Sequence, residues 1–133
     1  MHTGGCLCGA VRYRVDGSIE EVAACHCHQC KQAQGSAFAL NAPLSTDSFR
    51  FLSGEDYLQS YRHTPNKRRV FCKQCGSALF SQRDDKPEVI RLRLGTLDSP
   101  QLPAPHYHIH TDSAVDWCGF SDDQPRYPGD KSD

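Results

Sequence analysis

Cysteine constrains this chain more than any other residue, because seven of its eight cysteines gather in three short clusters. The clusters are Cys6 and Cys8, then Cys25, Cys27 and Cys30, then Cys72 and Cys75. Thiolates two or three positions apart can converge on one small cation, and a structural Zn²⁺ takes four ligands, with Zn–S distances of about 2.3 Å. Seven thiols are too many for one tetrahedral site and one too few for two. The sequence therefore predicts two zinc ions per chain, one of them with only three cysteine ligands.

Disulfide bonds are the alternative use of eight cysteines. The two thiols of a Cys-X-Cys or Cys-X-X-Cys pair are offered to the same neighbour, which suits a metal ion better than a disulfide framework. The first residues also lack the charged and apolar segments of a secretory signal peptide. We therefore expect a cytoplasmic protein, whose thiols stay reduced and available to metal.

Charge and hydropathy argue against two classes of partner. The formal net charge is −1 at pH 7, which gives no global field to attract nucleic acid or an anionic membrane. No apolar run approaches the roughly 18 residues that a membrane-spanning helix needs. We expect neither nucleic acid nor a membrane as a partner, and the sequence indicates no particular oligomeric state.

Short strands account for most of the hydrophobic pattern. Apolar and basic residues alternate over residues 11–15 and 89–94, as in half-buried strands, and the second run places Arg91 and Arg93 on one face. Further strands are expected at residues 49–51, 57–61, 69–71, 78–80 and 107–109. The one expected helix is short, over residues 29–34.

Turn residues punctuate these strands, among them Ser53-Gly54, Pro65-Asn66 and the run from Asn41 to Pro43. The pattern predicts an all-β fold of mainly antiparallel short strands. We read residues 1–133 as one domain, with a core over about 3–127 and a disordered tail at 128–133.

The spacing of the clusters favours one partition of the thiols. Cys72 and Cys75, followed by Gly76, have the form of a zinc knuckle. Cys6 and Cys8 lie among glycines and supply the complementary half, so that the four thiols would make a closed structural site. Cys25, Cys27 and Cys30 remain as a three-ligand set with an open coordination position. Two alternatives stay open at this point: His26, His28 or Cys118 closes the second site, or Cys25 and Cys27 join Cys72 and Cys75.

Three motifs in order make the chain resemble the glutathione-dependent formaldehyde-activating family. The motifs are residues 4–13, 25–31 and 71–80, and they are followed by the run 95–98 and by Pro105, His108 and Trp117. The resemblance implies a β-tent-like domain with two zinc ions. It implies that Cys6, Cys8, Cys72 and Cys75 hold structural zinc, and that Cys25, Cys27 and Cys30 hold catalytic zinc. It also implies a carbon–sulfur lyase that joins glutathione and formaldehyde into S-hydroxymethylglutathione.

An open zinc site would activate a substrate thiol that adds to a small aldehyde. A proton must then reach the oxygen of the adduct, and His26 and His28 are candidates because imidazole titrates near pH 6.5. The alternative is a non-catalytic zinc module of the same fold, which binds a protein or sequesters zinc.

Several remaining features have structural interpretations. His106, His108 and His110 alternate and could share one face of a strand, with His108 best placed to line a pocket. Cys118 and Phe38 are expected in the core, Cys118 within an apolar patch that ends at Phe120. The basic cluster is expected at a solvated hairpin end, and its alternative role is a clamp for substrate carboxylates. It comprises Arg62, Lys67, Arg68, Arg69 and Lys73.

Overall fold

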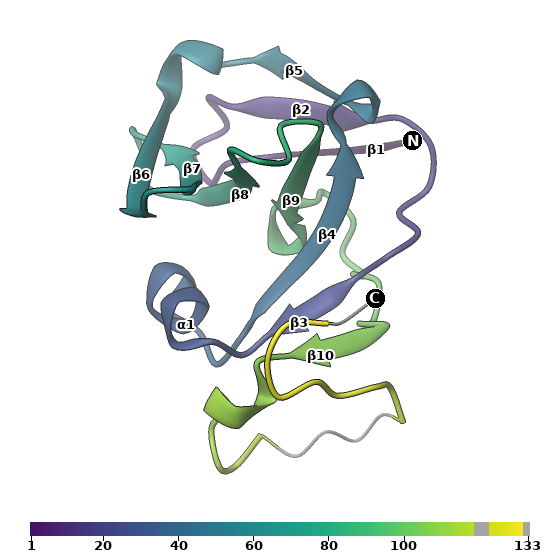
Figure 1. Ribbon diagram of the computed structural model, residues 1–133. Coiled ribbons are helices and arrows are strands. Elements are labelled where there is room, and N and C mark those ends of the chain that lie inside the picture. The colour runs from purple at the N-terminus through teal and green to yellow at the C-terminus, as the bar shows by residue number, and fades with distance from the viewer. Residues whose placement is uncertain (119–122, 132–133) are drawn as a thin grey trace. The chain divides into compact units, whose positions relative to one another are not determined.

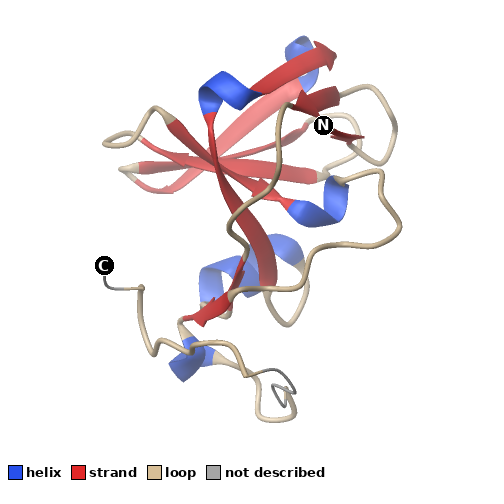
Figure 2. Cartoon of the chain, turned by 90° about the vertical axis from the view of Figure 1, so that its right-hand side faces the viewer, coloured by secondary structure: helices blue, strands red, loops and turns tan. Residues whose placement is uncertain are grey.

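A computed structural model describes residues 1–118 and 123–131 of the chain. Within these residues there are ten β-strands and one α-helix, and Figure 2 shows how strands and loops dominate. This confirms the all-β fold class. The chain forms two compact units, one from residues 1–20 and 42–102 and the other from residues 21–41 and 103–133. The single-domain assignment and the disordered tail at residues 128–133 remain predictions.

The first unit contains a three-stranded antiparallel sheet in the order β1-β2-β5, visible in Figure 1. Its strands are β1 (His2–Gly5), β2 (Arg12–Val15) and β5 (Phe49–Ser53). As its alternating pattern predicts, β2 buries Tyr13 and Val15 completely. The Tyr13 hydroxyl forms a hydrogen bond of 2.7 Å with Thr96 Oγ1, so the buried phenol keeps a polar partner.

Four further antiparallel strands of this unit follow one another as hairpins, in the order β9-β8-β7-β6. They are β6 (Leu58–Thr64), β7 (Lys67–Cys72), β8 (Ala78–Arg83) and β9 (Val89–Arg93). Phe80 on β8 packs against Phe49 and Phe51 with ring centroids 6.0 and 6.2 Å apart. These aromatic contacts join the two sheets of the unit through a shared apolar core.

The second unit is small and contains the central cysteine cluster. It comprises β3 (Ala23–Cys25), α1 (His28–Gln34), β10 (Tyr107–Ile109) and the start of β4 (Ala39–Ser45), which continues into the first unit. Strand β3 lies between β4, which is antiparallel to it, and β10, which is parallel. Four of the six buried side chains of this core are small, namely Ala23, Cys25, Cys30 and Ala39, and the other two are Tyr107 and Ile109.

Short 3₁₀ turns complete the described structure, at Thr46–Ser48, Glu55–Tyr57, Leu94–Thr96 and Thr111–Ser113. Among the described residues, no helix has both the length and the apolar character needed to cross a membrane.

The expected strands and helix are present, but the turn predicted from Asn41 to Pro43 is wrong. These residues lie inside β4, where Asn41 pairs with Ala23 of β3. Proline lacks the N–H that a central ladder needs, which is why the run reads as a turn. Pro43 lies two residues beyond the last β3 pairing, so that ladder loses no hydrogen bond. Strands β1, β3 and β4 were not predicted, because none of them alternates clearly.

Candidate metal centres

The end of β7 folds into the turn expected of a zinc knuckle. The Cys72 amide donates to the Ser77 carbonyl at 3.0 Å, and the Gly76 amide donates to the Cys72 carbonyl at 2.7 Å. Gly76 has φ +80°, a left-handed conformation in which a side chain would be strained. This turn sets the thiols of Cys72 and Cys75 on the same side of the chain.

A matching turn lies between β1 and β2. The Cys6 amide donates to the Val11 carbonyl at 3.1 Å, and the Val11 amide donates to Cys6 Sγ at 3.2 Å. Gly9 takes φ +81° and donates its amide to the Cys6 carbonyl at 3.1 Å. A backbone N–H aimed at sulfur stabilises the thiolate, the form that binds metal.

The two turns bring four sulfur atoms together across more than sixty residues of sequence. The Sγ atoms of Cys6, Cys8, Cys72 and Cys75 all lie within 4.8 Å of one another. Two of the separations are 3.5 Å (Cys6–Cys8) and 3.9 Å (Cys8–Cys72). Zn–S bonds of 2.3 Å in a tetrahedron put sulfurs about 3.8 Å apart, so the donor set fits a zinc ion.

Proton affinity differs among these four thiols. Hydrogen bonds from the Ser77 hydroxyl and backbone lower the pKa of Cys75 to about 5. Burial raises the pKa of Cys72 to about 11. A thiolate at Cys72 therefore needs a positive charge nearby, and a bound cation supplies it.

The second set of thiols lies in the second unit, at the junction of β3 and α1. Cys25 ends β3, Cys27 is the N-cap of α1, and Cys30 lies in the first helical turn. The Cys30 amide donates to Cys27 Sγ at 3.3 Å, which fixes the capping thiol over the helix start. The three Sγ atoms lie within 4.8 Å of one another.

Burial and hydrogen bonding favour the protonated form of Cys25, the first thiol of the second set. Cys25 and Cys30 are 4% and 2% exposed. Hydrogen bonds with the thiols of Cys27 and Cys30, together with burial, raise the pKa of Cys25 strongly. Replacement of these protons by one cation would turn three crowded thiols into ligands, so this set also fits a metal ion.

No fourth ligand joins this set among the described residues. The grouped donors are the three cysteines alone, without His26, His28 or Cys118. His28 is exposed at the start of α1. Cys118 is half-buried, so its predicted place in the core is wrong, and Phe120 of the proposed apolar patch lies outside the described residues.

His26 is paired with a second histidine. It is 0% exposed, and its Nε2 lies 3.0 Å from Nδ1 of His108, which is 5% exposed. The ring of Phe38, a residue expected in the core but 37% exposed, lies 5.2 Å away. Burial first, then the charges of His108 and Lys31, lower the pKa of His26 to about 4, so the imidazole is neutral at pH 7.

The three alternating histidines do not share one strand face. Only His108 lies within β10. His106 Nδ1 accepts a hydrogen bond from the Val22 amide at 3.0 Å. His110 has φ +55°, which turns the chain, and it pairs with Asp130 at 2.9 Å.

The pairing of His26 with His108 was not foreseen from the sequence. It depends on the parallel register of β10 and β3, which places His108 opposite Ala24. Parallel pairing of two three-residue strands leaves no alternation in the sequence from which it could be read.

A surface hollow of about 550 Å³ lies beside α1. His28 and Lys31 line it from the helix, and Val115 and Trp117 line it from the segment after β10. Lys31 Nζ donates to the Ser113 carbonyl at 2.5 Å, which ties that segment to the helix. Trp117 is 77% exposed, so the hollow presents an aromatic ring to solvent next to the helix that carries Cys30.

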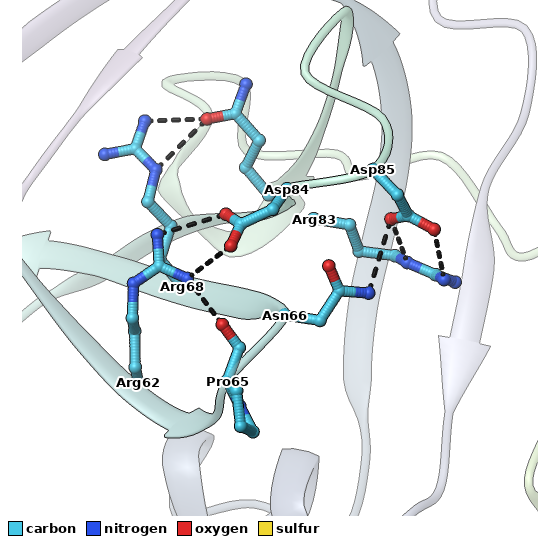
Figure 3. A network of polar contacts seen from close by, with 8 residues as sticks. Arg62, Pro65, Asn66, Arg68, Arg83, Asp84 and Asp85 are labelled. Atoms are coloured by element: carbon cyan, nitrogen blue, oxygen red, sulfur yellow. Dashed lines mark hydrogen bonds and ion pairs between the residues drawn. The ribbon is translucent and has the colours of Figure 1, made fainter.

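Of the basic cluster, Arg62 is exposed near the end of the β6–β7 hairpin, as expected (Figure 3), whereas Arg68 and Arg69 are half-buried within β7. Arg62 forms a bidentate ion pair with Asp84 at 2.9 and 3.0 Å and also donates to the Pro65 carbonyl. Arg68 donates to Gln82 Oε1 from two nitrogens.

Fold and site together define the chain as an all-β protein with two cysteine sets, each able to hold a metal ion. A family model described as glutathione-dependent formaldehyde-activating enzyme matches residues 1–113, and the chain belongs to that family. A Halomonas elongata protein named "Putative glutathione-dependent formaldehyde-activating enzyme" is 31% identical over 123 residues, 86% of this chain and 77% of that protein.

Two further proteins are similar to this chain. An uncharacterized lyase of Schizosaccharomyces pombe is 27% identical over 79 residues, 59% of this chain and 56% of that protein. A crystal structure of a Rhodobacter sphaeroides protein is similar with a TM-score of 0.63 and 25% identity, covering 74% of this chain and 90% of that chain.

Proposed function

We propose that the chain is a zinc-dependent carbon–sulfur lyase that forms and cleaves adducts of a thiol with a small aldehyde. Glutathione and formaldehyde are the proposed pair, with S-hydroxymethylglutathione as the adduct. The observation that carries the proposal is the three-thiol set, which has no fourth ligand among the described residues. Family membership supports the reaction class, since the family is described as formaldehyde-activating.

The proposed roles follow the two cysteine sets. Cys25, Cys27 and Cys30 would hold the catalytic zinc, and the four-thiol set of the first unit would hold structural zinc. Zinc held by these three thiolates would lower the proton affinity of a substrate thiol. The reaction then forms one carbon–sulfur bond, and the proton lost by the thiol ends on the former carbonyl oxygen.

Residues of the chain would orient this step and move its proton. The capping hydrogen bond from the Cys30 amide directs Cys27, which is half-buried, whereas Cys25 and Cys30 are enclosed. His28 is exposed and lies next to Cys27, so it is the candidate that can exchange a proton with solvent. His26 is enclosed and neutral, and His108 fixes the orientation of its ring.

The proposed chemistry requires reduced thiols and therefore a reducing compartment such as the cytoplasm. It requires no nucleic acid and no membrane.

Exchange NMR on a mixture of glutathione and formaldehyde tests the proposal. Zinc-loaded protein in catalytic amounts should accelerate interconversion of the free thiol and its adduct above the uncatalysed rate. Cys30→Ala should abolish the acceleration. Equal rates with and without wild-type protein would reject glutathione and formaldehyde as substrates and would favour the non-catalytic zinc module.

A further inference from the structure

Arg69, in the middle of β7, has a guanidinium group without a hydrogen-bond partner. Its Nη1 and Nη2 atoms are both shielded from solvent and make no hydrogen bond. Arg68, one position earlier, donates to Gln82 Oε1 at 3.1 and 2.7 Å, and Arg62 is paired with Asp84. Arg69 therefore stands apart from these two arginines of the basic cluster, because the described residues leave its charge without a partner.

Ser81 faces Arg69 across the ladder and also lacks a partner. The register places Arg69 opposite Ser81, and Ser81 opposite Arg91 of β9. Residues directly opposite one another in an antiparallel ladder lie on the same face. Ser81 is 0% exposed, and its Oγ makes no hydrogen bond within the described structure. Strands lie about 4.8 Å apart, so the Cα atoms of the two arginines flank the serine about 10 Å from each other.

The charge on this face of β7, β8 and β9 is positive. Lys67 and Arg83 are also directly opposite one another on it, and Arg93 lies two residues beyond Arg91. Among the described residues of these three strands that share the face, none is acidic. Arg83 is paired with Asp85 from the following turn (Figure 3). Arg69, Ser81 and Arg91 form a row across the three strands, and no described residue of these strands adds a carboxylate to it.

Burial of a guanidinium without a partner costs free energy, because the charged group loses its hydration. Arginine cannot avoid this cost by losing its proton. Two parallel N–H groups match the two oxygens of a carboxylate or a phosphate, and such charge-assisted pairs are among the strongest hydrogen bonds in proteins. A serine hydroxyl beside them can donate to the same anion. Arg69 and Arg91 are half-buried as whole residues, whereas the Nη1 and Nη2 atoms of Arg69 and the hydroxyl of Ser81 are enclosed.

We propose that Arg69 and Ser81, with Arg91 beside them, form a binding site for an oxyanion on the face of the β7-β8-β9 ladder. The ligand is a carboxylate or an inorganic phosphate. A thiol substrate that carries a carboxylate is one source of such an anion, and this source rests on the function proposed above. The anion site itself is inferred from the ladder register and from the unpaired polar atoms of Arg69 and Ser81, and it does not depend on the proposed function.

Anion titration of the zinc-loaded protein tests the site. Inorganic phosphate and succinate, each compared with sodium chloride at matched ionic strength, should shift the side-chain ¹⁵N resonances of Arg69 and raise the melting temperature with saturation. Arg69→Gln should weaken phosphate binding at least about tenfold, in line with a charge-assisted hydrogen bond. Ser81→Ala should weaken it less, and it keeps the charge.

Arg68→Gln is the matched control, because Arg68 is adjacent to Arg69 in sequence but lies on the opposite face of the ladder, where it is already paired with Gln82. It should bind phosphate as wild type does. No saturable shift at Arg69 with either anion, or equal weakening in Arg68→Gln and Arg69→Gln, would overturn the proposal.

Competition with S-methylglutathione separates the two sources. This molecule carries both glutathione carboxylates but has no thiol to react, so its binding does not depend on catalysis. Displacement of phosphate from Arg69 would identify the substrate carboxylate as the ligand. Phosphate binding without displacement would support the site with a free inorganic anion, whatever the lyase assay shows.

Discussion

At Gly54 the chain leaves β5 with φ +82°, and a Cβ placed there would lie 2.1 Å from the carbonyl oxygen of Ala10. Gly17 has nearly the same φ, +81°, but a Cβ would meet nothing within 4 Å. Substitutions at these two glycines therefore distinguish the cost of backbone strain from the cost of a steric clash. Both are needed for a left-handed conformation, and only Gly54 is needed for close packing.

We predict that Gly17→Ala lowers the free energy of unfolding by about 1 kcal/mol, because only conformational strain is added. Gly54→Ala should lower it by more than about 2 kcal/mol, since the β1–β2 connection must also move. Urea unfolding of both variants provides the comparison. Equal losses would show that the contact with Ala10 does not limit this turn.

Tyr13 leads to a pH prediction. Burial raises the pKa of its phenol from 10.0 to about 12. A neutral acid whose pKa is raised by folding contributes stability that is complete below pH 10 and is lost as the pH rises to 12. The shift corresponds to on the order of 2–3 kcal/mol.

Spectrophotometric titration of tyrosinate tests this prediction, because the chain contains five tyrosines. One of them should ionise near pH 12 together with unfolding, and this late component should be missing in Tyr13→Phe. A wild-type curve that is complete by pH 11 would contradict the predicted burial effect.

The knuckle at the end of β7 is the element whose stability should depend most on metal. Cys75→Ala removes one thiol of the four-membered set and should strongly lower the melting temperature, because metal binding and folding are coupled. Lys73→Ala lies in the same turn, is exposed and keeps its backbone hydrogen bond to Tyr57, so it should melt as wild type does. A normal melting temperature for Cys75→Ala would remove the structural role from this set.

For the whole molecule, the proposed metal content is two zinc ions per chain. Native mass spectrometry should find two ions in the wild type and one in Cys30→Ala, which should remain folded because the four-thiol set is intact. Two ions still bound to folded Cys30→Ala would show that the proposed division of ligands is wrong.

Features that depend on a few neighbouring residues were predicted correctly from the sequence. The alternation in residues 11–15 led to β2 with Tyr13 and Val15 buried, and Gly76 has the left-handed conformation expected after Cys75. These features depend on residues within one turn or one strand, where a period of two or a glycine is decisive. The turn predicted from Asn41 to Pro43 was wrong, because the missing N–H of Pro43 matters only at a position where the sheet requires a hydrogen bond from it.

By itself, the sequence determined the three cysteine clusters and the all-β class, since spacing and alternation are local properties of the chain. The tertiary structure decided which distant groups meet. It placed His108 against His26 through a parallel register, and it aligned Arg69, Ser81 and Arg91 in one row without a carboxylate. Strand register determines such neighbours, and a shift of one residue would turn each side chain to the other face.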